Sequence, residues 1–157
     1  MHHSTITYKI IPFQSLNPSI LYDILALREE VFMIEQQCTV ADLDHLDKQA
    51  VHIIGQCENL VCVTARILPP GVYKPNVVSF GRLLVKKEFR KKGVGTELMQ
   101  VIMRYIHTHY LHIPINISAQ FHLKNFYAHF GLKAVGQTYD EGGILHTKMV
   151  SIADAPK

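Results

Sequence analysis

Apolar and polar residues alternate in several short segments of the chain, whereas in other segments apolar residues recur at helical spacing. Alternation from Thr5 to Ile11 predicts a first strand. Asn17 followed by Pro18 is typical of a helix start, with Asn as the N-cap and Pro in the first turn. Apolar residues then recur every three or four positions from Leu21 onwards, so we expect a first helix that ends near Gln36.

The remainder of the chain alternates between the same two patterns. Glu58-Asn59 suits a hairpin turn, and Gly131 suits the residue that ends a helix. Strands are predicted at Val51–Gln56, Leu60–Leu68, Val77–Val85, Ile115–Ala119, Leu132–Gln137 and Ile144–Val150, with helices from Val94 and over Phe121–Phe130. The order β-α-β-β-β-α-β-α-β-β predicts an α/β protein, an α+β arrangement of a mixed sheet with helices packed on it. Without repeats or long linkers, residues 1–157 are expected to form one domain.

Composition narrows the class of protein. With 157 residues, 48% apolar and 18% charged, the chain is long enough for a single core and too apolar for disorder. No apolar run reaches the roughly 18–20 residues of a membrane span, and the N-terminus lacks the pattern of a secretory signal. Three cysteines without a metal-ligand spacing suggest reduced thiols. We therefore expect a soluble, cytoplasmic protein with no membrane partner.

Positive charge is concentrated in one short segment, Lys86–Lys92, which holds five basic residues and one acid. Gly93-Val94-Gly95 follows at once and opens a predicted helix. Cations oppose the dipole of a helix N-terminus, and its first N–H groups have no partner within the helix, so a bound anion would stabilise both. Glycine lets a phosphate approach those N–H groups. The alternative is a solvated basic loop, which the position between a strand and a helix disfavours.

The basic segment and its surroundings resemble a known enzyme family. Arg90-x-x-Gly93-x-Gly95 matches the acetyl-coenzyme A signature of the GNAT superfamily of N-acetyltransferases, and the order of elements resembles that fold. Further segments look like the ElaA-like branch of the superfamily. These are Arg28-x-x-x-Phe32-x-x-Glu35-Gln36, Ala65-Arg66-Ile67, Gly81-Arg82, Ala119-Gln120-x-His122-Leu123-x-x-Phe126-Tyr127-x-x-Phe130-Gly131 and Tyr139-x-Glu141-x-Gly143-Ile144-x-His146.

The resemblance implies acetyl-coenzyme A as cosubstrate, in a V-shaped split between the parallel strands Val77–Val85 and Ile115–Ala119. Its pyrophosphate would lie on Arg90–Gly95. Many family members carry an Asn where this chain has Gln120, and Gln keeps both a donor and an acceptor. The implied cofactor-binding residues are Leu83, Leu84, Val85, Arg90, Lys91, Lys92, Gly93, Val94, Gly95, Thr96, Gln120 and Phe126.

Catalytic roles follow from the resemblance combined with the needs of acyl transfer. Tyr127 is the implied proton donor to the departing thiolate, because a phenol is protonated at neutral pH; core packing is the alternative. A backbone N–H near Leu84 or Val85 is the implied oxyanion donor. Glu35, His122, Glu141 and His146 are candidates for the base, and His122 is preferred. His122 and Tyr127 would share a face only if their helix starts after His122.

The acceptor is expected to be a primary amine, either a small molecule or a peptide. Glu35, Gln36 and His146 are the implied substrate contacts, although Glu35 is also a possible carboxylate partner for the strand arginines Arg66 and Arg82. Histidine spacing does not suggest a metal site. A non-catalytic acyl-coenzyme A sensor is the rival interpretation, and nucleic-acid binding ranks last because the basic residues are confined to one turn. A homodimer is left open.

Overall fold

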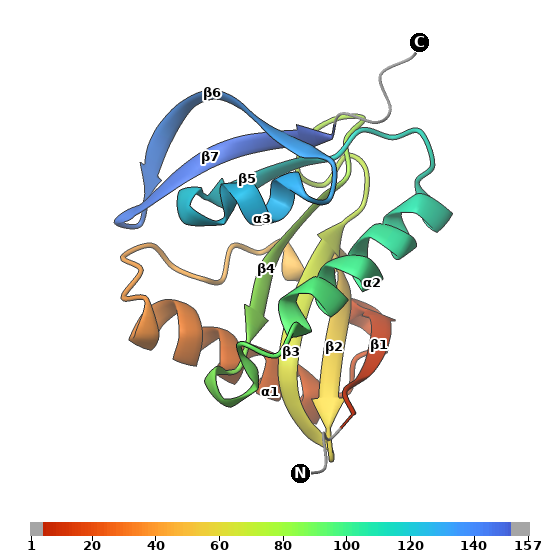
Figure 1. Cartoon of the computed structure of the whole chain (residues 1–157). Helices are drawn as coiled ribbons and strands as arrows, with labels where there is room; N and C mark the ends of the chain where they lie inside the picture. The colour runs from red at the N-terminus through yellow and green to blue at the C-terminus, as the bar shows by residue number, and fades with distance from the viewer. Residues whose placement is uncertain (1–4, 152–157) are drawn as a thin grey trace.

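Two antiparallel sheets form the framework of the protein (Figure 1). The computed structural model describes residues 5–151. The first sheet has the order β1-β2-β3-β4, and the second has the order β5-β7-β6. The strands are β1 Thr7–Pro12, β2 Val51–Cys57, β3 Leu60–Leu68, β4 Ser79–Val85, β5 Asn116–Gln120, β6 Leu132–Glu141 and β7 Ile144–Ser151. This order of elements agrees with the α/β class and the strand sequence that the pattern predicts.

The two sheets meet at one parallel bridge between Val78 and Ile115, just before β4 and β5. The N–H of Val78 donates to Pro114 at 3.0 Å, and the N–H of Asn116 donates to Val78 at 3.0 Å. Beyond this point each of the two strands pairs only with its own sheet, β4 with β3 and β5 with β7. The paired start and separate ends of β4 and β5 produce the V-shaped split that the resemblance implies (Figure 1).

Helices cover both faces of the first sheet. Helix α1, Pro18–Arg28, starts at Asn17, whose Oδ1 accepts the N–H of Ile20 at 2.8 Å as the sequence predicts. Helix α2, Val94–His109, packs on the opposite face, because Ile53 belongs to the core under α2 and its neighbour Ile54 to the core under α1. The buried residues of α2 are Val94, Leu98, Met99, Ile102 and Ile106.

Most predicted strand ends lie within two residues of the observed ones, but two helices and one strand differ more. The first helix continues to Glu35 as predicted, but Glu29–Glu35 is π-helical. The predicted helix Phe121–Phe130 is instead a 3-10 turn, Phe121–Leu123, followed by the short helix α3, Lys124–Ala128. Strand β6 extends to Glu141 because it pairs with β7 as far as Glu141 and Ile144. Further 3-10 turns lie at Phe13–Ser15, Asp47–Gln49 and Lys87–Phe89.

Candidate active site

A β-bulge interrupts β4 where it leaves β5. Thr64 pairs with Leu84 and Arg66 with Gly81, so Arg82 and Leu83 together oppose the single residue between Thr64 and Arg66. Arg82 has a φ of 53°, a left-handed conformation that is uncommon for a side chain of this size. The bulge places Leu83 in the wall of both cavities that the split contains.

Beyond the bulge, the direction of the backbone N–H groups follows from the ladder. The N–H of Lys86 donates to Cys62 at 2.7 Å, and donors alternate along an antiparallel strand. The N–H of Leu84 therefore also points to β3, whereas the N–H of Val85 points away from β3, into the split. The oxyanion donor is expected near Leu84 or Val85, and of these two residues only Val85 directs its N–H into the split; the Leu84 side chain is buried against α1.

The basic segment forms a turn that presents backbone rather than side chains. Lys91 and Gly93 both have left-handed backbones, with φ of 63° and 78°. Gly93 is the N-cap of α2 and no side chain caps the helix, so its first N–H groups remain available to a ligand. A Cβ on Gly93 would meet nothing within 4 Å, and one on Gly95 would come within 3.7 Å of Phe126 Cζ. The turn is thus open on the side where an anion would bind.

A cavity of about 390 Å³ lies between this turn and the end of β4. We call it the glycine-turn cavity. Its walls come from the π-helical segment, β4, the start of α2 and the segment around α3. Its lining residues are Val31, Glu35, Gln36, Leu83, Leu84, Val85, Arg90, Lys91, Gly93, Val94, Gly95, Leu98, His122, Leu123, Phe126 and Tyr127.

A second cavity, of about 460 Å³, lies on the other side of the bulge. We call it the hairpin cavity, because the β6–β7 hairpin and the loop of residues 38–46 form much of its wall. It shares Gln36, Leu83, His122, Leu123 and Tyr127 with the glycine-turn cavity. The two cavities therefore meet at the bulge and at Tyr127.

Tyr127 stands at this junction with a buried ring. Its ring lies 6.1 Å from that of Phe80 and 5.3 Å from that of Phe126, so packing also fixes its position. Burial raises the pKa of Tyr127 to about 12, which keeps the hydroxyl protonated at neutral pH. His122 lines both cavities as well, because α3 begins at Lys124 and the preceding 3-10 turn changes the direction of the chain. The condition for bringing His122 and Tyr127 to one site is met.

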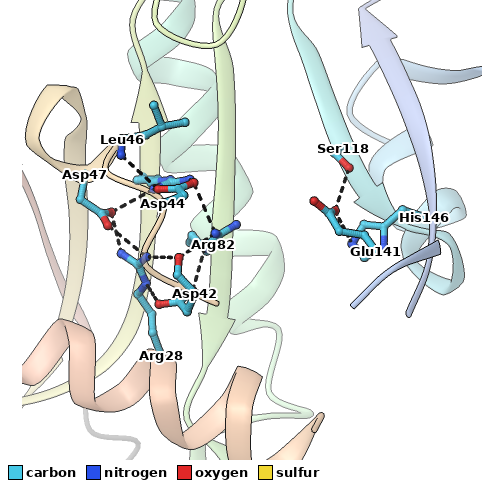
Figure 2. Close-up of polar contacts among 10 residues, drawn as sticks. Arg28, Asp42, Asp44, Leu46, Asp47, Arg82, Ser118, Glu141 and His146 are labelled. Atoms are coloured by element: carbon cyan, nitrogen blue, oxygen red, sulfur yellow. Dashed lines mark hydrogen bonds and ion pairs between the residues drawn. The ribbon is translucent and has the colours of Figure 1, made fainter. Parts of the chain in front are cut away.

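Three arginines and three aspartates form a network in one wall of the hairpin cavity (Figure 2). Arg28, from α1, donates to Asp42 at 2.8 Å and to Asp47 at 2.6 and 3.1 Å. Arg66, from β3, contacts Asp44 and Asp47. Arg82, from the bulge, lies 2.8 Å from an oxygen of Asp42 and donates to the Asp42 carbonyl at 2.8 Å. The network fastens the loop that carries the aspartates to α1, β3 and the bulge.

Opposite this network, Figure 2 shows Ser118, Glu141 and His146 grouped on the second sheet. The Nε2 atom of His146 lies 3.3 Å from Glu141 Oε2, and its Nδ1 lies 2.7 Å from the carbonyl oxygen of Ile144. Ser118 Oγ donates to Glu141 Oε2 at 3.4 Å. His146 is 8% exposed, whereas Glu141 is exposed.

Comparison with known proteins supports this picture. The profile of the family described as "Acetyltransferase (GNAT) domain" matches residues 33–152. The chain belongs to the GNAT family. It is 35% identical over 151 residues to Protein ElaA of Escherichia coli, an alignment that covers 95% of this chain and 92% of ElaA. It is 38% identical over 139 residues to a UPF0039 protein of Synechocystis, covering 88% and 90% of the two chains.

Solved structures show the same fold. The crystal structure of Escherichia coli ElaA superimposes with a TM-score of 0.87 at 33% identity, over 94% of this chain and 100% of that one. An acyl-CoA N-acyltransferase from Pseudomonas aeruginosa gives a TM-score of 0.89 at 29% identity, with the same coverage. The protein thus has the GNAT acyl-CoA N-acyltransferase fold and is ElaA-like, as the resemblance implied.

Within the GNAT framework, some predicted site residues lie elsewhere than expected. Glu35 is a wall of the glycine-turn cavity and holds Arg90 through two contacts, of 2.6 and 3.1 Å; the Arg90 hydrogen bond lowers the pKa of Glu35. The buried arginines of the strands have aspartate partners, so the suggestion that Glu35 pairs with them is wrong. Gln120 lines the hairpin cavity and donates to Gln36 at 3.0 Å. Lys92 and Thr96, which are expected to bind the cofactor, line neither the glycine-turn cavity nor the hairpin cavity.

Sequence reasoning missed the residues that shape the hairpin cavity, among them Asp42, Asp44, Ser118 and Tyr73. One signal was present: three arginines lie in apolar segments and three aspartates lie in one short loop. Buried arginines need carboxylate partners, so that balance could have pointed to the network.

Two classes of feature are absent from the part of the chain that the structure describes. Over residues 5–151, no helix has the length and hydropathy to cross a membrane. Within the same range, no group of three or more His, Cys, Asp or Glu side chains is arranged to hold a metal ion.

Proposed function

We propose that the protein is an N-acetyltransferase that transfers the acetyl group of acetyl-coenzyme A directly to a primary amine. The observation that carries this proposal is the meeting of two cavities at Leu83 and Tyr127. One cavity has an anion-binding turn, the other has polar groups of both charges, and the residues between them contact both. A thioester and an amine that enter from the two cavities would meet at this boundary.

The glycine-turn cavity fits coenzyme A. Its turn offers uncapped N–H groups at the start of α2, open space over Gly93 and the positive charges of Arg90 and Lys91, all of which favour a pyrophosphate. The N–H of Val85 points into the split and suits a pantetheine amide, which a neighbouring strand edge can bind as another strand would. These features support coenzyme A as the ligand of this cavity.

At the boundary, Leu83 and Tyr127 have complementary roles. The N–H of Leu83 in the bulge is the proposed donor to the oxyanion, because Leu83 is the bulge residue in contact with both cavities. The Tyr127 hydroxyl gives its proton to the leaving sulfur as it takes one from the attacking nitrogen, directly or through water. Because the phenol gains a proton while it loses one, its raised pKa does not require a phenolate to accumulate.

Tyr127→Phe is the test of catalysis. The variant keeps the packed ring and should bind acetyl-coenzyme A within about twofold of the wild type, while kcat falls by about 100-fold or more. Turnover is measured as thiol release over a panel of primary amines, with acetylated product identified by mass. The matched control is Tyr105→Phe on α2, which lies outside both cavities. An unchanged kcat would remove Tyr127 from the mechanism; coenzyme A binding with no amine acetylated would favour the sensor.

Gly95→Glu is the test of the coenzyme site. The new carboxylate would project from the turn beside Phe126 and repel the pyrophosphate. Calorimetry should show that the wild type binds acetyl-coenzyme A with a micromolar Kd, a binding free energy of about 8 kcal/mol, and that the variant does not bind it. Thr108→Glu adds the same charge at the other end of α2, and that control should bind normally. Equal binding by wild type and Gly95→Glu would place the coenzyme elsewhere.

A further inference from the structure

In the hairpin cavity, a histidine ring nitrogen and a carboxylate oxygen face each other. These are Nε2 of His146 and Oε2 of Glu141, 3.3 Å apart (Figure 2). The other ring nitrogen, Nδ1, lies 2.7 Å from the carbonyl oxygen of Ile144. A carbonyl oxygen only accepts hydrogen bonds, so Nδ1 carries the proton of the neutral ring and Nε2 has a lone pair.

A lone pair beside a carboxylate is an unfavourable contact unless a proton lies between them. The contact becomes favourable if the ring gains a proton or if a cation donates to both atoms. An alkylammonium has three N–H donors and can reach both acceptors at once. Ser118 Oγ donates to the same Oε2 atom of Glu141, and Tyr139 stacks on His146 at 6.0 Å, so the pair is held in place.

The other charged residues around the hairpin cavity are already paired, so the His146–Glu141 pair is where a cation would bind. The arginine–aspartate network across the cavity is neutral in total, with three guanidinium groups and three carboxylates. Among the described carboxylates that line the cavity, Glu141 is the one without an arginine partner. Tyr139 stacks on the His146 ring, and the other titratable or charged residues that line the cavity with His146 are Cys38, Asp42, Asp44, Arg66, Tyr73, Arg82, His122, Tyr127 and Glu141.

We propose that Glu141 binds the acceptor as a cationic primary amine, such as an aliphatic diamine or a lysine side chain, and that His146 takes its proton. This inference rests on the proposed acetyl transfer and names its acceptor class and base. The ammonium donates to Glu141 Oε2 and to His146 Nε2; the proton moves to Nε2, and the imidazolium stays paired with Glu141. The neutral amine forms its bond to the thioester carbon as the bond from carbon to sulfur breaks. The second nitrogen proton replaces the one that Tyr127 gives to sulfur, and His146 returns its proton to water.

His146 occupies a better position for this role than His122. It lies on β7 directly opposite Gln120, the last residue of β5, and therefore at the open end of the split on the acceptor side. His122 is exposed and lies on the boundary shared with the glycine-turn cavity. A base at His146 removes the proton before the nitrogen reaches the thioester.

Kinetics with cadaverine as the probe amine test the role of His146. At pH 7 a primary amine with a pKa near 10.4 is neutral in only about one molecule in 2,500, so the enzyme must remove the proton. His146→Gln should lower kcat/KM by about 100-fold at pH 7, and the loss should shrink to about threefold near pH 10 as solvent deprotonates the amine. His122→Gln should lower kcat/KM less than His146→Gln does. His107→Gln, on the exposed face of α2, is the matched control. A loss of kcat/KM that does not change with pH, or a larger loss in His122→Gln than in His146→Gln, overturns the assignment of His146 as the base.

Two further measurements separate this inference from the proposed function. Glu141→Gln should raise KM for cadaverine about tenfold more than it raises KM for aniline, an aromatic amine that carries no charge at pH 7. Glu58→Gln is the control, and an equal rise in the two KM values overturns the binding role. Nitrogen-15 NMR of labelled histidine should show the neutral ring of His146 protonated on Nδ1, and protonation on Nε2 overturns the proposal without any acceptor. If the wild type acetylates no amine although His146 has this tautomer, the proposed function fails instead. Peptide and diamine arms of the amine panel distinguish the two sources of the ammonium.

Discussion

Arg28→Met removes the most buried charge of the arginine–aspartate network while keeping an unbranched apolar side chain of comparable length. Arg28 is 1% exposed and donates to both Asp42 and Asp47. Removing one partner of a buried ion pair costs about 3–5 kcal/mol. Both carboxylates keep another arginine, since Asp47 contacts Arg66 at 3.1 Å and Asp42 contacts Arg82 at 2.8 Å. We therefore expect the lower value, about 3 kcal/mol of unfolding free energy.

The assay for Arg28→Met is thermal unfolding with binding measurements below the transition. For a chain of this size about 3 kcal/mol corresponds to a Tm lower by about 6–12 °C. Arg104→Met, on the exposed face of α2, should change Tm by less than about 2 °C. Because the loosened loop lines the hairpin cavity alone, the acceptor KM should rise while acetyl-coenzyme A affinity stays within about twofold. A Tm within about 2 °C of the wild type would refute the account of the network.

Three further predictions concern other contacts. Glu35→Gln removes a negative charge beside the basic turn, so calorimetry at low salt should show tighter acetyl-coenzyme A binding, and weaker binding would contradict this. Hydrogen bonds and charge from Arg66, with the charge of Arg82, hold the pKa of Asp44 below its usual range. The ionised carboxylate therefore stabilises the folded state fully above the unfolded pKa near 3.9, and this contribution is lost as pH falls through the folded pKa. Urea midpoints should thus be steady from about pH 7 to 5 and fall below about pH 4. Gly142→Ala should destabilise more than Gly143→Ala in urea titrations, because both have left-handed backbones but only a Cβ on Gly142 would overlap Cys38 Sγ. Equal losses would show that backbone strain alone decides.

Local patterns predicted the elements because the information for them is local. The hairpin turn at Glu58-Asn59 has left-handed φ values of 49° and 68°, as a two-residue hairpin requires. The cap at Asn17 and the glycine turn before α2 are also fixed by adjacent residues. Family resemblance added what adjacent residues cannot show, namely that β4 and β5 separate around a cleft.

The parts that sequence reasoning missed depend on contacts between distant residues. The residues Gly81-Arg82-Leu83 do not by themselves predict a bulge, because contacts to an aspartate forty positions away hold the left-handed φ of Arg82. The π-helical turns that follow α1 keep the apolar spacing of an α-helix closely enough to be indistinguishable in the sequence. The pairing of His146 with Glu141 requires the extended β6–β7 hairpin, which the shorter predicted strand did not include.

The junction of the two cavities also has a consequence for how two substrates can bind. If, as proposed, coenzyme A binds from the side of α2 and the acceptor binds from the side of the β6–β7 hairpin, neither blocks the entrance of the other. On that proposal the acyl group passes directly from coenzyme A to the amine, and no covalent acyl-enzyme intermediate is needed. Initial-rate plots at several fixed concentrations of either substrate should therefore intersect, as they do when a ternary complex forms, and desulfo-coenzyme A should compete with acetyl-coenzyme A but not with the amine.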